Sequence, residues 1–352
     1  MPNCSELGAH NVASCGQWDV DSLCCTVMYP KNETLTQTKV ASVTGGAGMS
    51  HDAAVTIRDV TPRDGLQSEA PLPASTRAGL VAALAAAGVE HIEAASFVSP
   101  RHVPAMADGA AVFAQATASG AVLWALVPNA RGAADAFAAG TRHLTVTISA
   151  SEQYSSKNVG RSVAGAVSDL SDIAAVAAER GGHVQIDVVV SCAFGSPFAD
   201  VTSPAPVVRL VESITNGMPT ARITLADTTG TATPRRLGAV IDALPAAARR
   251  DLGLHLHDTR GTALANALWS LERGVRRFDT AVGGLGGSPF APGAGGNLAT
   301  EDLVMVLDDL GIETGINLGD ILAIADGLPE LVGHAVPSRT STAGPLNPFD
   351  SA

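Results

Sequence analysis

The chain lacks both a long uninterrupted hydrophobic run and a net positive charge. No apolar stretch reaches about 18 residues, so no transmembrane helix is expected. The formal net charge is −12, whereas a surface that binds nucleic acid needs basic patches. We therefore expect neither a membrane nor a nucleic acid among the partners of this protein.

Cysteine is nearly absent from the main part of the chain. Cys4, Cys15, Cys24 and Cys25 all lie within residues 1–48, and only Cys192 lies beyond them. The same segment lacks the basic start and apolar core of a signal peptide. We expect a cytoplasmic protein without a disulfide framework. Residues 1–48 are predicted to be a disordered leader, or the result of a mis-assigned start with the natural start at Met49.

From residue 55 onward, short apolar runs that indicate strands alternate with longer segments that indicate helices. The expected strands span 55–61, 91–97, 123–128, 144–150, 184–192, 223–230, 252–258 and 278–286. The expected helices span 75–87, 102–118, 130–139, 162–180, 261–273 and 299–310, with two more starting near Pro204 and Pro234. Eight units within roughly 260 residues fit a TIM barrel better than an open doubly wound sheet.

The domain organisation follows from this count. Residues 49–319 are predicted to form the α/β TIM-barrel catalytic domain. Residues 320–352 are predicted to form a short C-terminal helical extension, with a helix over about 317–332, and a polar tail.

Polar residues gather where the expected strands end, which is the edge of a TIM barrel that carries the active site. They are Arg63, Asp64, Glu93, Asp227, Thr228, His255, His257, Asn297 and Glu301. His255 and His257 are two residues apart on a strand, so their side chains face the same way. Each residue alone would more often be an ion-pair or core residue. Together they predict a divalent-metal site with nitrogen and oxygen ligands.

Several long motifs resemble those of the HMG-CoA lyase family, within the pyruvate-carboxyltransferase-like metal-dependent barrels. The motifs are Thr61–Gln67 (TPRDGLQ), Ala95–Pro100 (ASFVSP), His255–Thr259 (HLHDT), Gly283–Gly287 (GGLGG) and Gly295–Asp302 (GGNLATED). The resemblance runs from about Val55 to Gly319. The SFVSP and GNLATED stretches favour the lyase branch over the related isopropylmalate and homocitrate synthases.

The resemblance implies a metal site and a reaction. The family's ligand positions match Asp64, His255, His257 and Asn297, which would hold Mg²⁺ or Mn²⁺. The implied reaction is retro-Claisen cleavage of HMG-CoA to acetyl-CoA and acetoacetate, as in leucine catabolism. The acyl-CoA substrate is the implied partner, and we also expect a homodimer or higher homo-oligomer.

The resemblance also suggests roles for individual residues. Arg63 would stabilise the enolate oxygen, or else form a salt bridge to Asp64 or Glu93. His255 would combine metal binding with proton transfer. The carboxylates that would orient Arg63 and the ligands are Glu93, Asp227 and Glu301. The residues expected to contact substrate are Arg63, Gln67, Thr228 and Asn297. Arg260 borders the same edge and would contact a substrate carboxylate or CoA phosphate, or simply be exposed.

One position departs from the family pattern. Ser288 stands where the family's signature loop carries a cysteine that transfers a proton. A hydroxyl is a poorer general acid than a thiol. The protein would therefore cleave HMG-CoA slowly, use water or His255 for the proton, or act on another acyl-CoA such as citramalyl-CoA or a longer-chain hydroxyglutaryl-CoA. A synthase and a non-catalytic metal-binding relative also stay open at this point.

Overall fold

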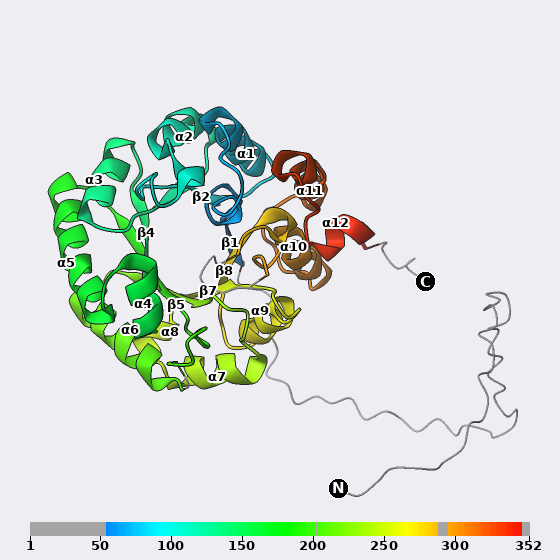
Figure 1. Ribbon diagram of the computed structural model, residues 1–352. Helices are drawn as coiled ribbons and strands as arrows, with labels where there is room; N and C mark the ends of the chain where they lie inside the picture. The colour runs from blue at the N-terminus through cyan, green and yellow to red at the C-terminus, as the bar shows by residue number, and fades with distance from the viewer. Residues whose placement is uncertain (1–53, 202, 288–294, 347–352) are drawn as a thin grey trace, which may run out of the picture. The chain divides into compact units, whose positions relative to one another are not determined.

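The computed structural model describes residues 54–201, 203–287 and 295–346. Within these residues, eight parallel strands close into a barrel in the order β1 to β8, and helices surround it (Figure 1). The predicted TIM barrel is confirmed. The predicted leader and Ser288 lie outside the described residues.

The strands are short and all follow the predicted apolar runs. They are β1 (Thr56–Asp59), β2 (His91–Ser96), β3 (Val122–Leu126), β4 (His143–Ser149), β5 (Gln185–Ser191), β6 (Arg222–Asp227), β7 (Leu252–Leu256) and β8 (Arg277–Thr280). In β2 the pairing register with β3 shifts between Glu93 and Ala95. Such irregularities re-aim side chains and are common beside active sites.

The helices between strands return the chain to the start of the next strand, and the last three helices follow β8. They are α1 (Ala74–Ala86), α2 (Gly109–Ala116), α3 (Ala130–Ala138), α4 (Glu152–Val159), α5 (Val163–Arg180), α6 (Ala205–Gly217), α7 (Pro234–Ala243), α8 (Ala246–Arg249), α9 (Ala263–Leu271), α10 (Thr300–Asp309), α11 (Leu318–Val332) and α12 (Arg339–Ala343). Asn129, Ser162 and Thr233 cap the starts of α3, α5 and α7 by accepting a backbone N–H. These capping residues explain why the helices begin where they do.

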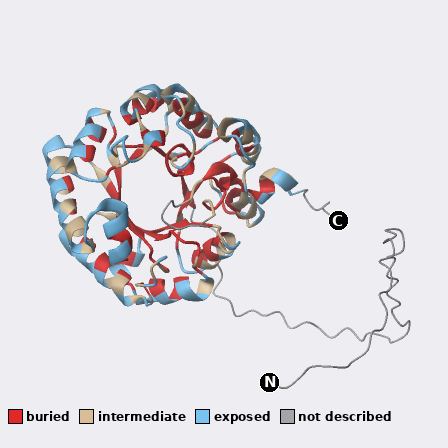
Figure 2. Cartoon of the chain, viewed as in Figure 1, coloured by how far each residue is buried: buried red, intermediate tan, exposed pale blue. Residues whose placement is uncertain are grey.

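Side-chain alternation along the strands separates a hydrophobic layer from a polar interior. Ile57 and Phe278 point outward into the core between strands and helices. Their neighbours Arg58 and Asp279 point inward and form an ion pair across the strand boundary. Figure 2 shows the strands and the inward faces of the helices buried, with the outer helix faces exposed. The barrel interior is therefore lined partly by charged groups.

Several boundaries differ from the sequence-based expectations. The helix expected over 102–118 is broken, because Asp108 has a left-handed backbone (φ 58°) and α2 starts only after it. The strand expected over 278–286 ends at Thr280, and Gly283 and Gly284 then turn the chain with positive φ. The strand expected over 55–61 ends at Asp59, and a π-helical turn, Thr61–Gly65, follows it.

Helices α4, α8 and α12 were not predicted. The last of these lies in the segment expected to be a polar tail, and α11 spans the expected boundary at residue 319. Among the described helices, none combines the length and apolar composition needed to cross a bilayer.

Candidate active site

Three ionisable side chains converge at the C-terminal ends of the strands. Ligand-type atoms of Asp64, His255 and His257 all lie within 4.8 Å of one another, and all three residues are buried. The Nε2 atoms of the two histidines are 3.2 Å apart. They lie 3.8 Å and 4.0 Å from Asp64 Oδ2. A single cation placed between these atoms could contact all three side chains.

Asn297 completes what we call the metal-ligand cluster: Asp64, His255, His257 and Asn297. Its backbone bridges to His257, and its Nδ2 donates to Asp64 Oδ2 at 2.8 Å and to the Leu285 carbonyl. Its Oδ1 is buried without a hydrogen-bond partner. An orphaned amide oxygen beside a carboxylate and two imidazoles fits a divalent cation that accepts oxygen and nitrogen ligands.

The protonation states in the cluster also suit metal binding. Burial alone would raise the pKa of Asp64, but Arg63 and the two histidines lower it to about 2. Burial and the neighbouring His255 lower the pKa of His257 to about 4. Although burial lowers the pKa of His255, its hydrogen bond with Asp279 and the charge of Asp64 leave it raised. At neutral pH the cluster thus offers an anionic carboxylate and a neutral His257, the forms that bind metal.

Arg63 lies between two carboxylates. Its Nη1 donates to Asp64 Oδ1 and its Nε donates to Glu93 Oε2, and all three side chains are buried. The salt bridges that the sequence left as an alternative are both present. Gln67 Nε2 also donates to Asp64 Oδ1 at 3.0 Å. Two carboxylates therefore share one guanidinium.

Three other predicted site residues brace backbone rather than join the cluster. Asp227 accepts from the backbone N–H groups of Thr231 and Ala232, and burial raises its pKa to about 6. Thr228 Oγ1 accepts from the backbone of Cys192. Glu301 accepts from the backbone of Gly283. Their contacts shape the loops around the metal-ligand cluster.

Arg260 is exposed, which agrees with one of the two alternatives that the sequence left open. Its Nη1 donates to the carbonyls of Thr229 and Gly230. In this position the guanidinium fixes the loop after β6.

Sequence reasoning missed a second group of charges, which we call the interior ion-pair cluster: Arg58, Asp187, Asp279 and Arg277. Arg58 pairs with Asp187 at 2.9 Å and Asp279 at 2.8 Å, and Arg277 pairs with Asp187 at 3.2 Å. Asp279 Oδ2 also lies 3.2 Å from His255 Nδ1. The sequence does carry one sign of this cluster, because these charged residues interrupt strands that are otherwise largely apolar.

The HMGL-like family model matches residues 54–328. The chain belongs to the HMGL-like family. It is 40% identical to the (R)-citramalyl-CoA lyase of Chloroflexus aurantiacus over 311 residues, covering 84% of this chain and 96% of that protein. It is 39% identical to the mitochondrial hydroxymethylglutaryl-CoA lyase of Rattus norvegicus, covering 82% and 89%.

Solved structures agree with this HMGL-like assignment. The HMG-CoA lyase of Bacillus subtilis superposes with a TM-score of 0.78 at 35% identity, covering 82% of this chain and 97% of that one. An HMG-CoA lyase of Acinetobacter baumannii in complex with coenzyme A and 3-methylmalate gives 0.77 at 37%, covering 84% and 98%. The relatives act on acyl-CoA substrates, and this HMGL-like protein is a carbon–carbon lyase.

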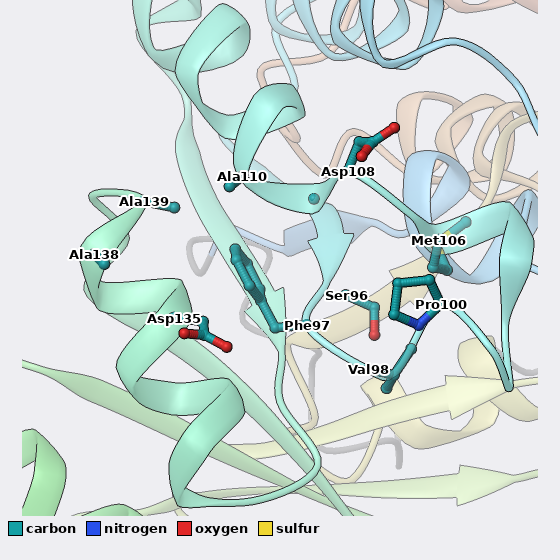
Figure 3. A pocket seen from close by; sticks show the side chains of 11 residues that line it. Ser96, Phe97, Val98, Pro100, Met106, Asp108, Ala110, Asp135, Ala138 and Ala139 are labelled. Carbon is teal, nitrogen blue, oxygen red and sulfur yellow. The ribbon is translucent and has the colours of Figure 1, made fainter.

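A cavity of about 450 Å³ lies beside the loop after β2, near α2 and α3 (Figure 3). Phe97, Val98 and Ala110 line it together with the carboxylates of Asp108 and Asp135. No member of the metal-ligand cluster lines this cavity. Because two carboxylates would repel the phosphates of CoA, we place no part of the substrate there.

Proposed function

We propose that this HMGL-like lyase cleaves HMG-CoA to acetyl-CoA and acetoacetate in a retro-Claisen reaction that depends on a divalent cation. The observation that carries the proposal is the convergence of Asp64, His255 and His257 beside Arg63. The orphaned Oδ1 of Asn297 supplies the fourth proposed ligand. A donor set of two oxygens and two imidazole nitrogens without a thiolate, with positions left for substrate oxygens, suits Mg²⁺ or Mn²⁺. The similarity to proteins named as HMG-CoA lyases supports the choice of substrate.

When bound, a divalent cation would lower the pKa of the substrate's tertiary hydroxyl and hold its oxygen atoms. After that hydroxyl passes its proton to a water molecule, the bond between C2 and C3 breaks. Its electrons pass to the acetyl-CoA enolate while C3 becomes the ketone of acetoacetate. Arg63 suits the enolate oxygen, because Glu93 and Asp64 engage only two of the five N–H donors of its guanidinium. Glu93 then positions Arg63.

His255 is assigned to metal binding alone. Its Nδ1 lies 3.2 Å from Asp279, and its Nε2 faces His257 and Asp64. With both ring nitrogens engaged, the imidazole has no free atom for moving a substrate proton. The proton that the enolate carbon must gain is instead assigned to Ser288 or to water near it, with Ser288 acting as a weak donor.

A second substrate is favoured by the similarity to a protein named (R)-citramalyl-CoA lyase. Citramalyl-CoA has one methylene fewer than HMG-CoA between the hydroxyl-bearing carbon and the free carboxylate. The same bond cleavage would then release acetyl-CoA and pyruvate. The cluster can serve either substrate, because the hydroxyl and thioester are arranged alike in both.

The test is to supply each acyl-CoA separately, with Mg²⁺ and with chelator. Acetyl-CoA is measured together with acetoacetate or pyruvate. We expect metal-dependent release of acetoacetate from HMG-CoA, rising roughly tenfold or more in Ser288→Cys. Ser213→Cys, a change on an exposed face of α6, is the matched control and should leave the rate unchanged.

Pyruvate release from citramalyl-CoA without turnover of HMG-CoA would replace the first substrate by the second. No release from either substrate would contradict both and move the search to longer-chain hydroxyglutaryl-CoA. We further propose a cytoplasmic homo-oligomer that acts in the breakdown of leucine-derived acids.

A further inference from the structure

Asp279 on β8 connects the two buried charge clusters. Arg58 holds it in a two-pronged contact, with Nε to Oδ1 at 2.9 Å and Nη2 to Oδ2 at 2.8 Å. The same Oδ2 lies 3.2 Å from His255 Nδ1. One carboxylate oxygen therefore touches both an interior cation and a proposed metal ligand.

The position of Asp279 is strongly constrained. Arg58 is itself fixed, because its Nη1 pairs with Asp187 at 2.9 Å and its guanidinium carbon lies 4.9 Å from the centre of the Trp124 ring. Arg58 and Asp279 are each 5% exposed, and Asp187 is fully buried. A carboxylate with both oxygens bound by a planar guanidinium has little freedom to rotate.

The chemistry of the contact decides which ring nitrogen of His255 carries hydrogen. An ionised carboxylate only accepts hydrogen bonds. The nitrogen that faces Asp279, which is Nδ1, must therefore be the donor in the neutral ring. Nε2 is left with its lone pair, and that atom faces His257 and Asp64. Among the described residues, His257 has no carboxylate within hydrogen-bond distance, so this arrangement belongs to His255 alone.

We propose that Asp279, held by Arg58, is a positioning residue that fixes His255 with hydrogen on Nδ1 and thereby presents Nε2 to the cation. The part of the inference that concerns the cation rests on the proposed function. The part that concerns the hydrogen position holds in the metal-free protein. Carboxylates that bind the far nitrogen of a ligating histidine in this way set both its orientation and its basicity.

The test uses ring nitrogen NMR of the full chain labelled in its histidines, without metal, at a pH where the ring is neutral. Signals of His255 are assigned by their loss in His255→Gln. The compared variants are Asp279→Asn and Asp187→Asn. The second removes a carboxylate from the same arginine without touching His255, so it is the matched control. Calorimetric titration with Mn²⁺ follows on each protein.

We expect wild type and Asp187→Asn to carry the His255 hydrogen on Nδ1, and Asp279→Asn to shift it wholly or partly to Nε2. The affinity for Mn²⁺ should fall roughly 10- to 100-fold in Asp279→Asn and stay close to wild type in Asp187→Asn. A wild-type hydrogen on Nε2 would overturn the inference, whether or not either variant folds. Equal losses of affinity in both variants would overturn it too, because they would indicate general loosening of the interior.

Failure of the proposed function would look different. If the hydrogen sits on Nδ1 in the wild type and moves in Asp279→Asn, Asp279 positions the ring as inferred. Absence of Mn²⁺ binding to that same wild-type protein would then contradict the metal-dependent reaction and leave the hydrogen position established.

Discussion

The interior ion-pair cluster and the metal-ligand cluster meet at Asp279 and His255 in the same barrel, yet they balance charge differently. In the interior cluster, two arginines face two aspartates, and the contacts measure 2.8–3.2 Å. At the C-terminal rim, Arg63 alone faces both Asp64 and Glu93. The rim also holds the imidazoles of His255 and His257 and the amide oxygen of Asn297, which has no hydrogen-bond partner.

We interpret this difference as the one between a structural site and the proposed functional site. A buried charge is tolerated when it is paired and hydrogen-bonded, as it is throughout the interior cluster. At the rim, two carboxylates share one arginine beside atoms that can bind a cation. Apart from Asp279, which contacts His255, we therefore expect changes in the interior to reduce stability, and changes at the rim to reduce activity.

The largest effect is expected at the rim. Asp64→Asn removes the anionic ligand, so acetyl-CoA release should fall by about 10³-fold or more, since a bound cation contributes several kcal/mol to the transition state. The free energy of unfolding should change much less. Steady-state rates and urea unfolding measure the two quantities. Asp251→Asn, at a half-exposed side chain, is the control. Near-normal turnover by Asp64→Asn would contradict the assignment.

The next effect is expected in the interior. Arg58→Met leaves Asp187 and Asp279 buried with one cation fewer, which should destabilise the protein by about 3–5 kcal/mol. Urea unfolding followed by circular dichroism measures this loss. Removing one carboxylate as well, in Arg58→Met with Asp187→Asn, should recover part of it. A loss below about 1 kcal/mol, the range of exposed pairs, would show that the interior cluster is not a structural element.

Glu301 is a buried carboxylate whose contribution to the unfolding free energy should depend on pH. Burial raises its pKa from 4.5 to about 7, so the folded protein holds a proton that the unfolded chain has lost. Its contribution to stability is full below about pH 4.5 and is lost as pH rises through about 7, at roughly 1.4 kcal/mol per pKa unit. Glu301→Gln should remove this decline. The difference in unfolding free energy between wild type and variant is measured from pH 5 to 8. Parallel curves would contradict the raised pKa.

The smallest effect is expected on the surface. Arg161 pairs with Asp169 at 3.4 Å, and its side chain is 58% exposed. Arg161→Ala should change the unfolding free energy by less than about 1 kcal/mol and leave turnover unaltered. A larger loss of stability would contradict the view that burial decides how much an ion pair contributes to the unfolding free energy of this protein.

The sequence predicted the barrel because strand and helix patterns repeat along the chain. It predicted the ends of β2 and α5 within a residue, since Ser162 and Gly181 cap α5. It failed where backbone conformation depends on tertiary contacts. The π-helical turn Thr61–Gly65 is held by hydrogen bonds of Thr61 to Asp59 and to the distant Val282. No local sequence pattern indicates the contact between Thr61 and Val282.

The same limit applies to the site. His255 and His257 could be placed together because alternation on one strand fixes their direction. The ion pairs that join Arg58 to Asp187 and Asp279 connect residues 129 and 221 positions apart, so only the closed barrel reveals them. Asp227 and Glu301 were expected to orient Arg63 and the ligands, and the hydrogen bonds that they accept from loop backbone could not be predicted without the loops in place.

The most direct test of the central claim is to strip the full chain of metal and restore it stepwise with Mn²⁺. Binding is followed by calorimetry, and acetyl-CoA release from HMG-CoA is followed on the same samples. We predict one binding site per chain, release that rises in proportion to its occupancy, and neither binding nor release in Asp64→Asn. Undiminished release by the stripped protein in chelator would contradict a metal-dependent lyase.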